Sequence, residues 1–317
     1  MSTSIMHLLR NTATVALSAL LSACTNVALQ AVNLPSYLMS DLRLERGIAY
    51  GERADQKLDL YLPIESAQQR RQLVVFIYGG AWTSGSRADY FFVADALTAA
   101  GYAVAIPDYI KYPRGAFPAF VDDVAQSIAW LSAHIDRYAP IDEFVLMGHS
   151  AGAHTAALLI TDPAYFTAQQ KEIAPIGAFV GLAGPYGFKP DSRKYQNIFA
   201  NLDDYNQMRP LHFVTGNEPP MLLLHGSADT TVLPVNTRKF AERVLAGGGS
   251  AQAQYYDDVG HIAPVLAMSR LPFANRHMRA DILEFLDSRN GGAVGGADEQ
   301  RAISHSGQVD KTGISPE

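Results

Sequence analysis

The chain has 317 residues, of which 48% are hydrophobic and 18% are charged, and it contains 25 glycines, 17 prolines and one cysteine. This composition excludes a collagen, a coiled coil and a chain that is disordered throughout. The net charge of −6 at pH 7 gives no general attraction to nucleic acid, so we expect no nucleic-acid partner.

The first 23 residues predict a secretory signal. Arg10 precedes a run of small and apolar residues from Thr12 to Leu21, and two more small residues follow it. A basic start, a short apolar stretch and small residues at its end are typical of exported proteins, and this stretch is too short to span a bilayer. We therefore expect residues 1–23 to be removed on export.

Leu21-Ser22-Ala23-Cys24 resembles the lipobox of bacterial lipoproteins. That resemblance implies a lipoprotein signal peptide over residues 1–23, a lipid on Cys24 and attachment to a bacterial membrane through this N-terminal anchor. Thr25, in place of an aspartate, resembles the sorting signal for an outer membrane, on the side facing the periplasm. The alternative is a plain secretory signal, but the chain's only cysteine stands where the lipobox requires it.

Residues 24–44 are predicted to link the anchor to one folded domain over residues 45–289. Glycine and polar residues dominate from Asn290 onward, so residues 290–317 are predicted to form a disordered tail. Within the domain, short β-rich runs alternate with helical patterns. This alternation is typical of an α/β fold with a mostly parallel sheet flanked by helices.

Eight strands are expected, at residues 47–50, 57–62, 73–78, 103–107, 143–147, 177–182, 221–225 and 253–256. The middle ones are almost wholly apolar, as strands buried on both faces of a sheet are. Helices are expected at residues 88–100, 119–135, 151–160, 235–246 and 276–288. Residues 187–219 are more polar and weakly periodic, which predicts a small cap over the sheet.

A serine between two glycines follows the fifth expected strand, in Gly148-His149-Ser150-Ala151-Gly152. A serine hydroxyl is a weak nucleophile unless it is held in place beside a base. A sharp turn from strand to helix presents it, and the glycines two positions before and after it leave room for that turn. Ser150 is therefore the predicted nucleophile.

The base and the acid are predicted from the chain order Ser…Asp…His that accompanies such a turn. His261 lies in the loop after the last expected strand, and Asp229 lies after the strand before it. A carboxylate in that place holds the imidazole in the required tautomer and stabilises its charged form. Asp257 and Asp258 are competing acids because they are close to His261 in sequence.

The oxyanion of the reaction needs two backbone N–H donors. One is predicted from Ala151, the residue after the nucleophile. The other is predicted from Gly80 or Ala81, in the glycine-rich turn after the third strand, and the sequence does not choose between them. The expected substrate contacts are Tyr78, Gly79, Trp82 and His149. No cluster of cysteines and histidines has the spacing of metal ligands, so we expect neither a metal nor another cofactor.

From about residue 47 to 288 the chain resembles the α/β-hydrolases of the esterase/lipase superfamily. Three segments carry the resemblance, namely Gly79-Gly80-Ala81-Trp82 with Gly85, Asp108-Tyr109 followed by Pro113 and Phe117-Pro118, and Gly148-His149-Ser150-Ala151-Gly152-Ala153-His154. They are similar to segments of the branch that contains kynurenine formamidases, isoprenylcysteine methylesterases and feruloyl-esterase-like enzymes. Tyr78 and Ile110 depart from that pattern, since many members have histidine and arginine there.

The resemblance implies an α/β-hydrolase fold and a serine carboxylesterase that cleaves small soluble esters, with Ser150, Asp229 and His261 as its triad. An amidase or arylformamidase that uses the same triad is an alternative. A lipid-anchored binding protein with an inactive site on this fold is another. The sequence does not indicate an oligomeric state.

Overall fold

The computed structural model describes residues 31–64, 70–200 and 202–289. Within them, eight strands form one sheet in the order β1-β2-β4-β3-β5-β6-β7-β8. β1 and β2 pair antiparallel, as do β2 and β4, and the other neighbouring strands are parallel. The strands are β1 Leu42–Ala49, β2 Lys57–Pro63, β3 Gln72–Ile77, β4 Ala103–Pro107, β5 Glu143–His149, β6 Ile176–Leu182, β7 Met221–Gly226 and β8 Ala251–Tyr256.

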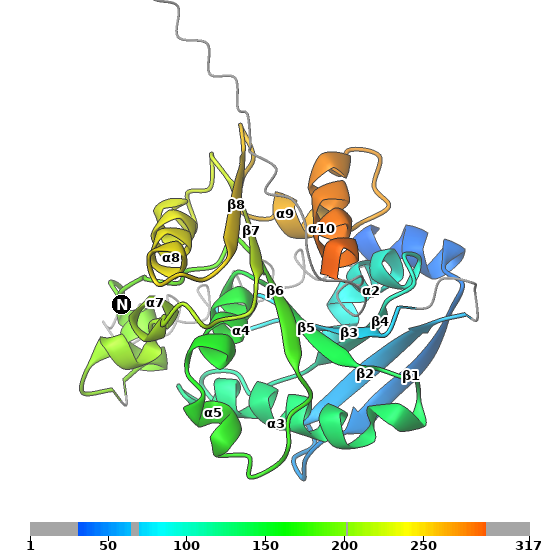
Figure 1. Cartoon of the computed structure of the whole chain (residues 1–317), viewed down its shortest axis with the longest axis horizontal. Coiled ribbons are helices and arrows are strands. Elements are labelled where there is room, and N and C mark those ends of the chain that lie inside the picture. Colours follow the sequence, from blue (N-terminus) through cyan, green and yellow to red (C-terminus); the bar gives the residue numbers. More distant parts are fainter. Residues whose placement is uncertain (1–30, 65–69, 201, 290–317) are drawn as a thin grey trace, which may run out of the picture.

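Helices cover both faces of the sheet (Figure 1), with α2 and α10 on one face and α3, α4 and α8 on the other. These five are α2 Phe91–Thr98, α3 Ala119–His134, α4 Ala151–Thr161, α8 Val235–Ala246 and α10 Arg276–Arg289. Shorter helical segments are η1 Arg87–Tyr90, η2 Ile135–Arg137, α5 Ala164–Thr167, α6 Arg193–Ile198, η3 Tyr205–Met208, α7 Pro210–Phe213 and α9 Ala263–Leu266. The expected mostly parallel sheet between two helical layers is confirmed.

Burial on both faces explains why the central strands could be predicted from apolar runs in the sequence. All six residues of β3 are buried, as are all six of β7, because helices cover both faces of the sheet there. On α3, the apolar residues Phe120, Val124, Ile128 and Leu131 form one buried stripe against the sheet.

The first strand is longer than the sequence predicted. β1 begins at Leu42 rather than at residue 47, and each of its residues is half-buried or exposed. Antiparallel strands commonly have one face in solvent, and the polar residues on that face hide such a strand from a search for apolar runs. The pairing of β1 with β2 shifts register between Glu45 and Ile48, where Gly47 has a φ of 66°.

The described part of the predicted linker over residues 24–44 contains one short helix and the start of β1. Residues 31–39 form a helix, and Asn33 on it is fully buried. The Asn33 amide donates to the carbonyls of Ala88 and Asp89 at 3.2 and 3.0 Å, and its oxygen accepts from the N–H of Phe92 at 3.0 Å. Asn33 thereby supplies an acceptor for a backbone N–H in the first turn of α2, and it attaches the N-terminal helix to the domain. The predicted signal peptide and C-terminal tail lie outside the described residues.

The region predicted as a cap, residues 187–219, lies between β6 and β7 and contains α6, η3 and α7. It packs against α4. His154 of α4 holds it, because the His154 Nε2–H donates to the carbonyl of Met208 at 2.6 Å. In the part of the chain that the structure describes, no helix has the length and apolar character needed to cross a membrane.

Candidate active site

The turn between β5 and α4 positions Ser150. Ser150 has a φ of 55°, which a non-glycine residue rarely adopts. A Cβ added to Gly152 would lie 2.0 Å from the carbonyl oxygen of Ile77, and one added to Gly148 would lie 2.6 Å from the nitrogen of Ala153. The Ser150 N–H donates to the carbonyl of Leu182 at 2.9 Å, which fixes the turn to β6. A side chain at either glycine would clash with neighbouring backbone atoms, so both positions need glycine. Ser150 is held in a strained conformation at the end of β5.

The structure brings Ser150, His261 and Asp229 together at the carboxyl edge of the sheet. His261 Nε2 lies 2.8 Å from Ser150 Oγ, and its Nδ1 lies 2.7 Å from Asp229 Oδ2. Asp229 follows β7, and His261 follows β8. The competing acids Asp257 and Asp258 are exposed, and neither is hydrogen-bonded to the His261 ring.

The surroundings of Asp229 favour its ionised form. It is buried, and its Oδ1 accepts from the N–H groups of Thr231 and Val232, both at 2.9 Å. Burial by itself would raise the pKa of Asp229, but the hydrogen bonds from Val232, His261 and Thr231 outweigh it and hold the pKa below its usual value. The carboxylate thus stays charged at neutral pH and can fix the tautomer of His261.

Two of the residues predicted to supply oxyanion donors, Ala151 and Ala81, line the cavity beside Ser150. Ala151 is the first residue of α4, so its N–H has no acceptor within the helix. Ala81 lines the same cavity, and its φ is 51°. Gly80 does not line it, and a Cβ added to Gly80 would lie 2.2 Å from the carbonyl oxygen of Ser84. Of the two predicted donors from this turn, Ala81 is the one on the cavity wall.

A buried ion-pair network fixes that turn. Arg87, which follows it, donates from Nε to Asp59 at 2.7 Å, from its backbone N–H to Asp108 at 2.9 Å and from its guanidinium to the same carboxylate. The Tyr78 hydroxyl also donates to Asp108, at 2.7 Å. No sequence motif marks Arg87, because its partners are 28 and 21 residues away in the chain.

Three of the four residues expected to contact the substrate do not line this cavity. Tyr78 is fully buried and its hydroxyl is used by Asp108, and a Cβ on Gly79 would lie 3.1 Å from the Ser150 Cβ, beneath the turn. The buried His149 ring donates from Nε2 to the carbonyl of His261 at 3.0 Å, so it positions the loop of the base. Trp82 alone of the four lines the cavity.

The cavity beside Ser150 has a volume of about 420 Å³. Its wall includes an aromatic group formed by Trp82, Phe188 and Tyr195, in which the Trp82 and Phe188 rings stack with centroids 5.6 Å apart. Phe188 and Tyr195 come from the cap, and Val232 and Lys239 come from the segment after β7. Neither the cap nor that segment shows a sequence motif that marks its residues as cavity-lining.

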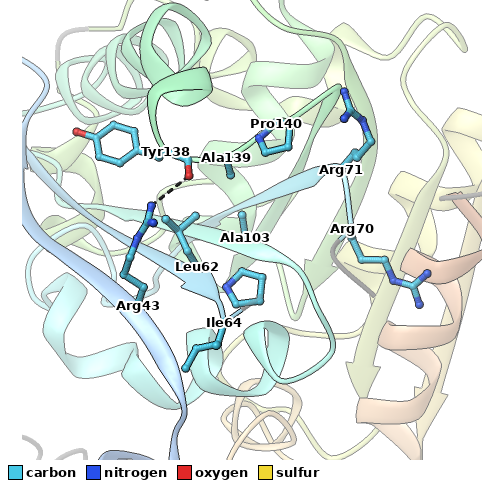
Figure 2. Close-up of a pocket in the computed structure, with 10 residues that line it drawn as sticks. Arg43, Leu62, Ile64, Arg70, Arg71, Ala103, Tyr138, Ala139 and Pro140 are labelled. Carbon is cyan, nitrogen blue, oxygen red and sulfur yellow. Dashed lines mark hydrogen bonds between the residues drawn. The ribbon is translucent and has the colours of Figure 1, made fainter. Parts of the chain in front are cut away.

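A second cavity, of about 620 Å³, lies at the opposite edge of the sheet, where the parallel strands begin. Figure 2 shows it, with Arg43 donating to the carbonyl of Tyr138 at 3.1 Å. Its lining contains no serine, cysteine or histidine. The hydrogen-bonded Ser150, His261 and Asp229 therefore make the smaller cavity the candidate active site.

A family model for BD-FAE matches residues 58–244, which is more than half of the chain. The chain belongs to the BD-FAE family. It is 29% identical to esterase LipC of Mycobacterium tuberculosis, over 63% of this chain and 55% of the relative. It is 28% identical to isoprenylcysteine alpha-carbonyl methylesterase of Arabidopsis thaliana, over 71% of this chain and 58% of the relative. The chain thus spans less than two thirds of the length of these curated relatives.

Solved structures show the same fold. Esterase B from Lactobacillus rhamnosis superposes with a TM-score of 0.73 at 19% identity, covering 88% of this chain and 95% of that one. The apo form of Thermogutta terrifontis esterase 2 superposes with a TM-score of 0.66 at 21% identity, covering 81% and 97%. The architecture is the α/β-hydrolase fold, as the sequence motifs implied.

Acid is expected to destabilise this protein through the two histidines beside the site. Burial lowers the pKa of His149 from 6.5 to about 3, with the His261 ring adding to the effect, and burial lowers the pKa of His154 from 6.5 to about 4. Below pH 6.5 the unfolded chain therefore binds protons that the folded chain does not. Each histidine should lower the free energy of unfolding by about 1.4 kcal/mol per pH unit between about pH 6 and 4.

Urea unfolding at about pH 7.5, 6 and 5 measures this loss. His154→Gln keeps an N–H donor for Met208 and removes the titration, so it should flatten the slope by about 1.4 kcal/mol per pH unit. His277→Gln is the matched control, since this side chain is exposed on α10 and is hydrated in both states. A slope for His154→Gln equal to that of the wild type would contradict the assignment.

Proposed function

We propose that this protein is a serine carboxylesterase that hydrolyses small soluble carboxylic esters through an acyl-enzyme. The observation that carries the proposal is the unbroken hydrogen-bonded series from Ser150 through His261 to Asp229 at the wall of a cavity. The esterase names of the relatives support the same reaction class. The cavity of about 420 Å³ suits a small ester, since ligand pockets usually measure about 300–1,000 Å³.

In the proposed mechanism, Ser150 Oγ attacks the ester carbonyl carbon while His261 Nε2 takes the hydroxyl proton. The N–H groups of Ala151 and Ala81 stabilise the oxyanion of the tetrahedral intermediate. The C–O bond to the alcohol then breaks, and His261 returns the proton to the leaving oxygen. Water attacks the acyl-enzyme by the same route, which releases the carboxylic acid and restores Ser150.

Asp229 and His149 keep His261 ready for both proton transfers. Asp229 accepts from Nδ1–H, so Nε2 is the free base that faces Ser150. His149 holds the backbone carbonyl of His261, and its lowered pKa keeps the His149 ring neutral beside the imidazolium that forms. A second positive charge therefore does not develop next to the base.

We also propose export and lipid anchoring at Cys24, on a bacterial outer membrane facing the periplasm. The sequence from Leu21 to Thr25 supports this location. A tethered enzyme with a cavity of this size would act on soluble esters that diffuse to it, rather than on the bilayer itself.

Ser150→Ala should abolish hydrolysis of p-nitrophenyl butyrate. Loss of the nucleophile should lower kcat/KM by about 10⁴-fold or more, because the base then has no hydroxyl to activate. Ser288→Ala, a serine on α10 remote from the cavity, is the matched control and should retain wild-type turnover. Wild-type turnover by purified Ser150→Ala would rule the mechanism out.

Cys24→Ala should release the protein from the membrane fraction of the expressing bacterium into the soluble fraction, because an acylated cysteine supplies the anchor. Fractionation with immunoblotting measures the distribution, and Ser22→Ala is a control that keeps the cysteine. Membrane association that is unchanged in Cys24→Ala would show that the anchor lies elsewhere.

A further inference from the structure

The candidate active-site cavity carries an excess of positive charge. Lys189, Arg209 and Lys239 line it, with Asp191 as its only carboxylate. None of these four side chains takes part in an ion pair within the described residues. The chain as a whole has a net charge of −6, so this local charge of opposite sign is a distinct feature of the cavity.

Arg209 is the best-positioned of the three cations. Its guanidinium donates to the carbonyl of Gly187 at 2.9 Å and to the Asn206 side-chain oxygen at 3.1 Å. Both acceptors are neutral, so they orient the guanidinium without neutralising it. Its Nε is buried and has no acceptor in the part of the chain that the structure describes. A half-buried guanidinium that neutral acceptors hold in place, and that keeps its charge, is suited to bind a carboxylate or phosphate.

The two lysines add to the field at the mouth of the cavity. Lys189 is exposed on the cap, and Lys239 is exposed on α8. Clustered cations at a cleft raise the local concentration of an anionic substrate and speed its association. A cationic ester would meet three like charges and one opposite charge, so it would be disfavoured.

The aromatic wall supplies the complementary apolar surface. Trp82 and Phe188 stack beside Tyr195, and Trp82 is adjacent in sequence to the proposed oxyanion donor Ala81. The cavity thus offers a reaction centre, an apolar wall and a cationic group. A matching substrate has an ester, a short apolar segment and an anionic end.

We propose that the preferred substrates are esters that carry an anionic group, a carboxylate or a phosphate, bound by Arg209 with Lys189 and Lys239 at the rim. This inference rests on the proposed esterase function and names its substrate class. Because the anion could belong to the acyl or to the alcohol part of the ester, the test has an arm for each.

The test compares esters that differ only by replacement of a terminal methyl with an anion. Ethyl hydrogen adipate is compared with ethyl hexanoate on the acyl side. 4-(Butyryloxy)butanoate and 3-(butyryloxy)propyl phosphate are compared with butyl butyrate on the alcohol side. Acid release in a pH-stat gives kcat/KM. At least one anionic ester should exceed its neutral partner by about 10-fold or more, and added NaCl should reduce that ratio.

Charge removal identifies the residues responsible. Arg209→Gln should lower the anionic-to-neutral ratio of kcat/KM by about 10-fold or more, and Lys239→Gln, at an exposed position that folding does not need, should lower it by about 2- to 5-fold. Arg238→Gln is the matched control, since it removes the same charge from the neighbouring residue of α8 outside the cavity. It should leave the ratio unchanged.

Binding to the Ser150→Ala protein separates the two proposals. Calorimetric titration of that variant with ethyl hydrogen adipate or 3-(butyryloxy)propyl phosphate should show at least about 10-fold tighter binding than with the neutral partner. If the anionic esters bind tightly but the wild-type protein does not hydrolyse them, the proposed anion site is supported and the proposed esterase function is refuted. Hydrolysis of all five esters with no anionic preference, and no effect of Arg209→Gln on the ratios, would refute the anion site alone.

Discussion

The close contact between Gly152 and the carbonyl of Ile77 is the constraint on which the site depends. A Cβ at Gly152 would lie 2.0 Å from that oxygen, so α4 can approach β3 only if residue 152 is glycine. This approach forces the turn at Ser150 into a left-handed φ of 55°. The same turn places the Ser150 hydroxyl within 2.8 Å of His261 Nε2 and makes Ala151 the first residue of α4. One steric requirement thereby sets the places of both the proposed nucleophile and a proposed oxyanion donor.

The remaining parts of the site are held by polar contacts between segments that are distant in the chain. Asp229 comes to His261 on loops from neighbouring strands, His149 fixes the backbone of His261, and the network of Arg87 and Asp108 fixes the turn at Ala81. Buried charges of this kind are costly unless they are paired, so the network has few alternative arrangements. The proposed reaction uses groups at strand ends, whereas the proposed substrate preference depends on the cap and α8.

The features that local residue patterns determine could be predicted from the sequence. Continuous apolar runs located the buried strands, and glycine spacing with chain order selected Ser150, Asp229 and His261, which the structure brings into hydrogen-bond contact. Features that depend on hydrogen-bond partners far away in the chain could not be predicted. Nothing near Asn33 or Arg87 indicates their roles, and Tyr78 and His149 stand beside the reactive turn yet point into buried hydrogen bonds. Of the two neighbours of Ser150 in sequence, Ala151 lines the cavity and His149 does not.

The most direct test of the central claim is to locate the serine that reacts with a fluorophosphonate probe, by peptide mass spectrometry of the labelled protein. Such probes report a serine that a neighbouring base activates. We expect one phosphonylated residue, Ser150, and loss of labelling in a folded His261→Gln variant. An unlabelled Ser150, or labelling that persists at the wild-type rate without His261, would contradict it.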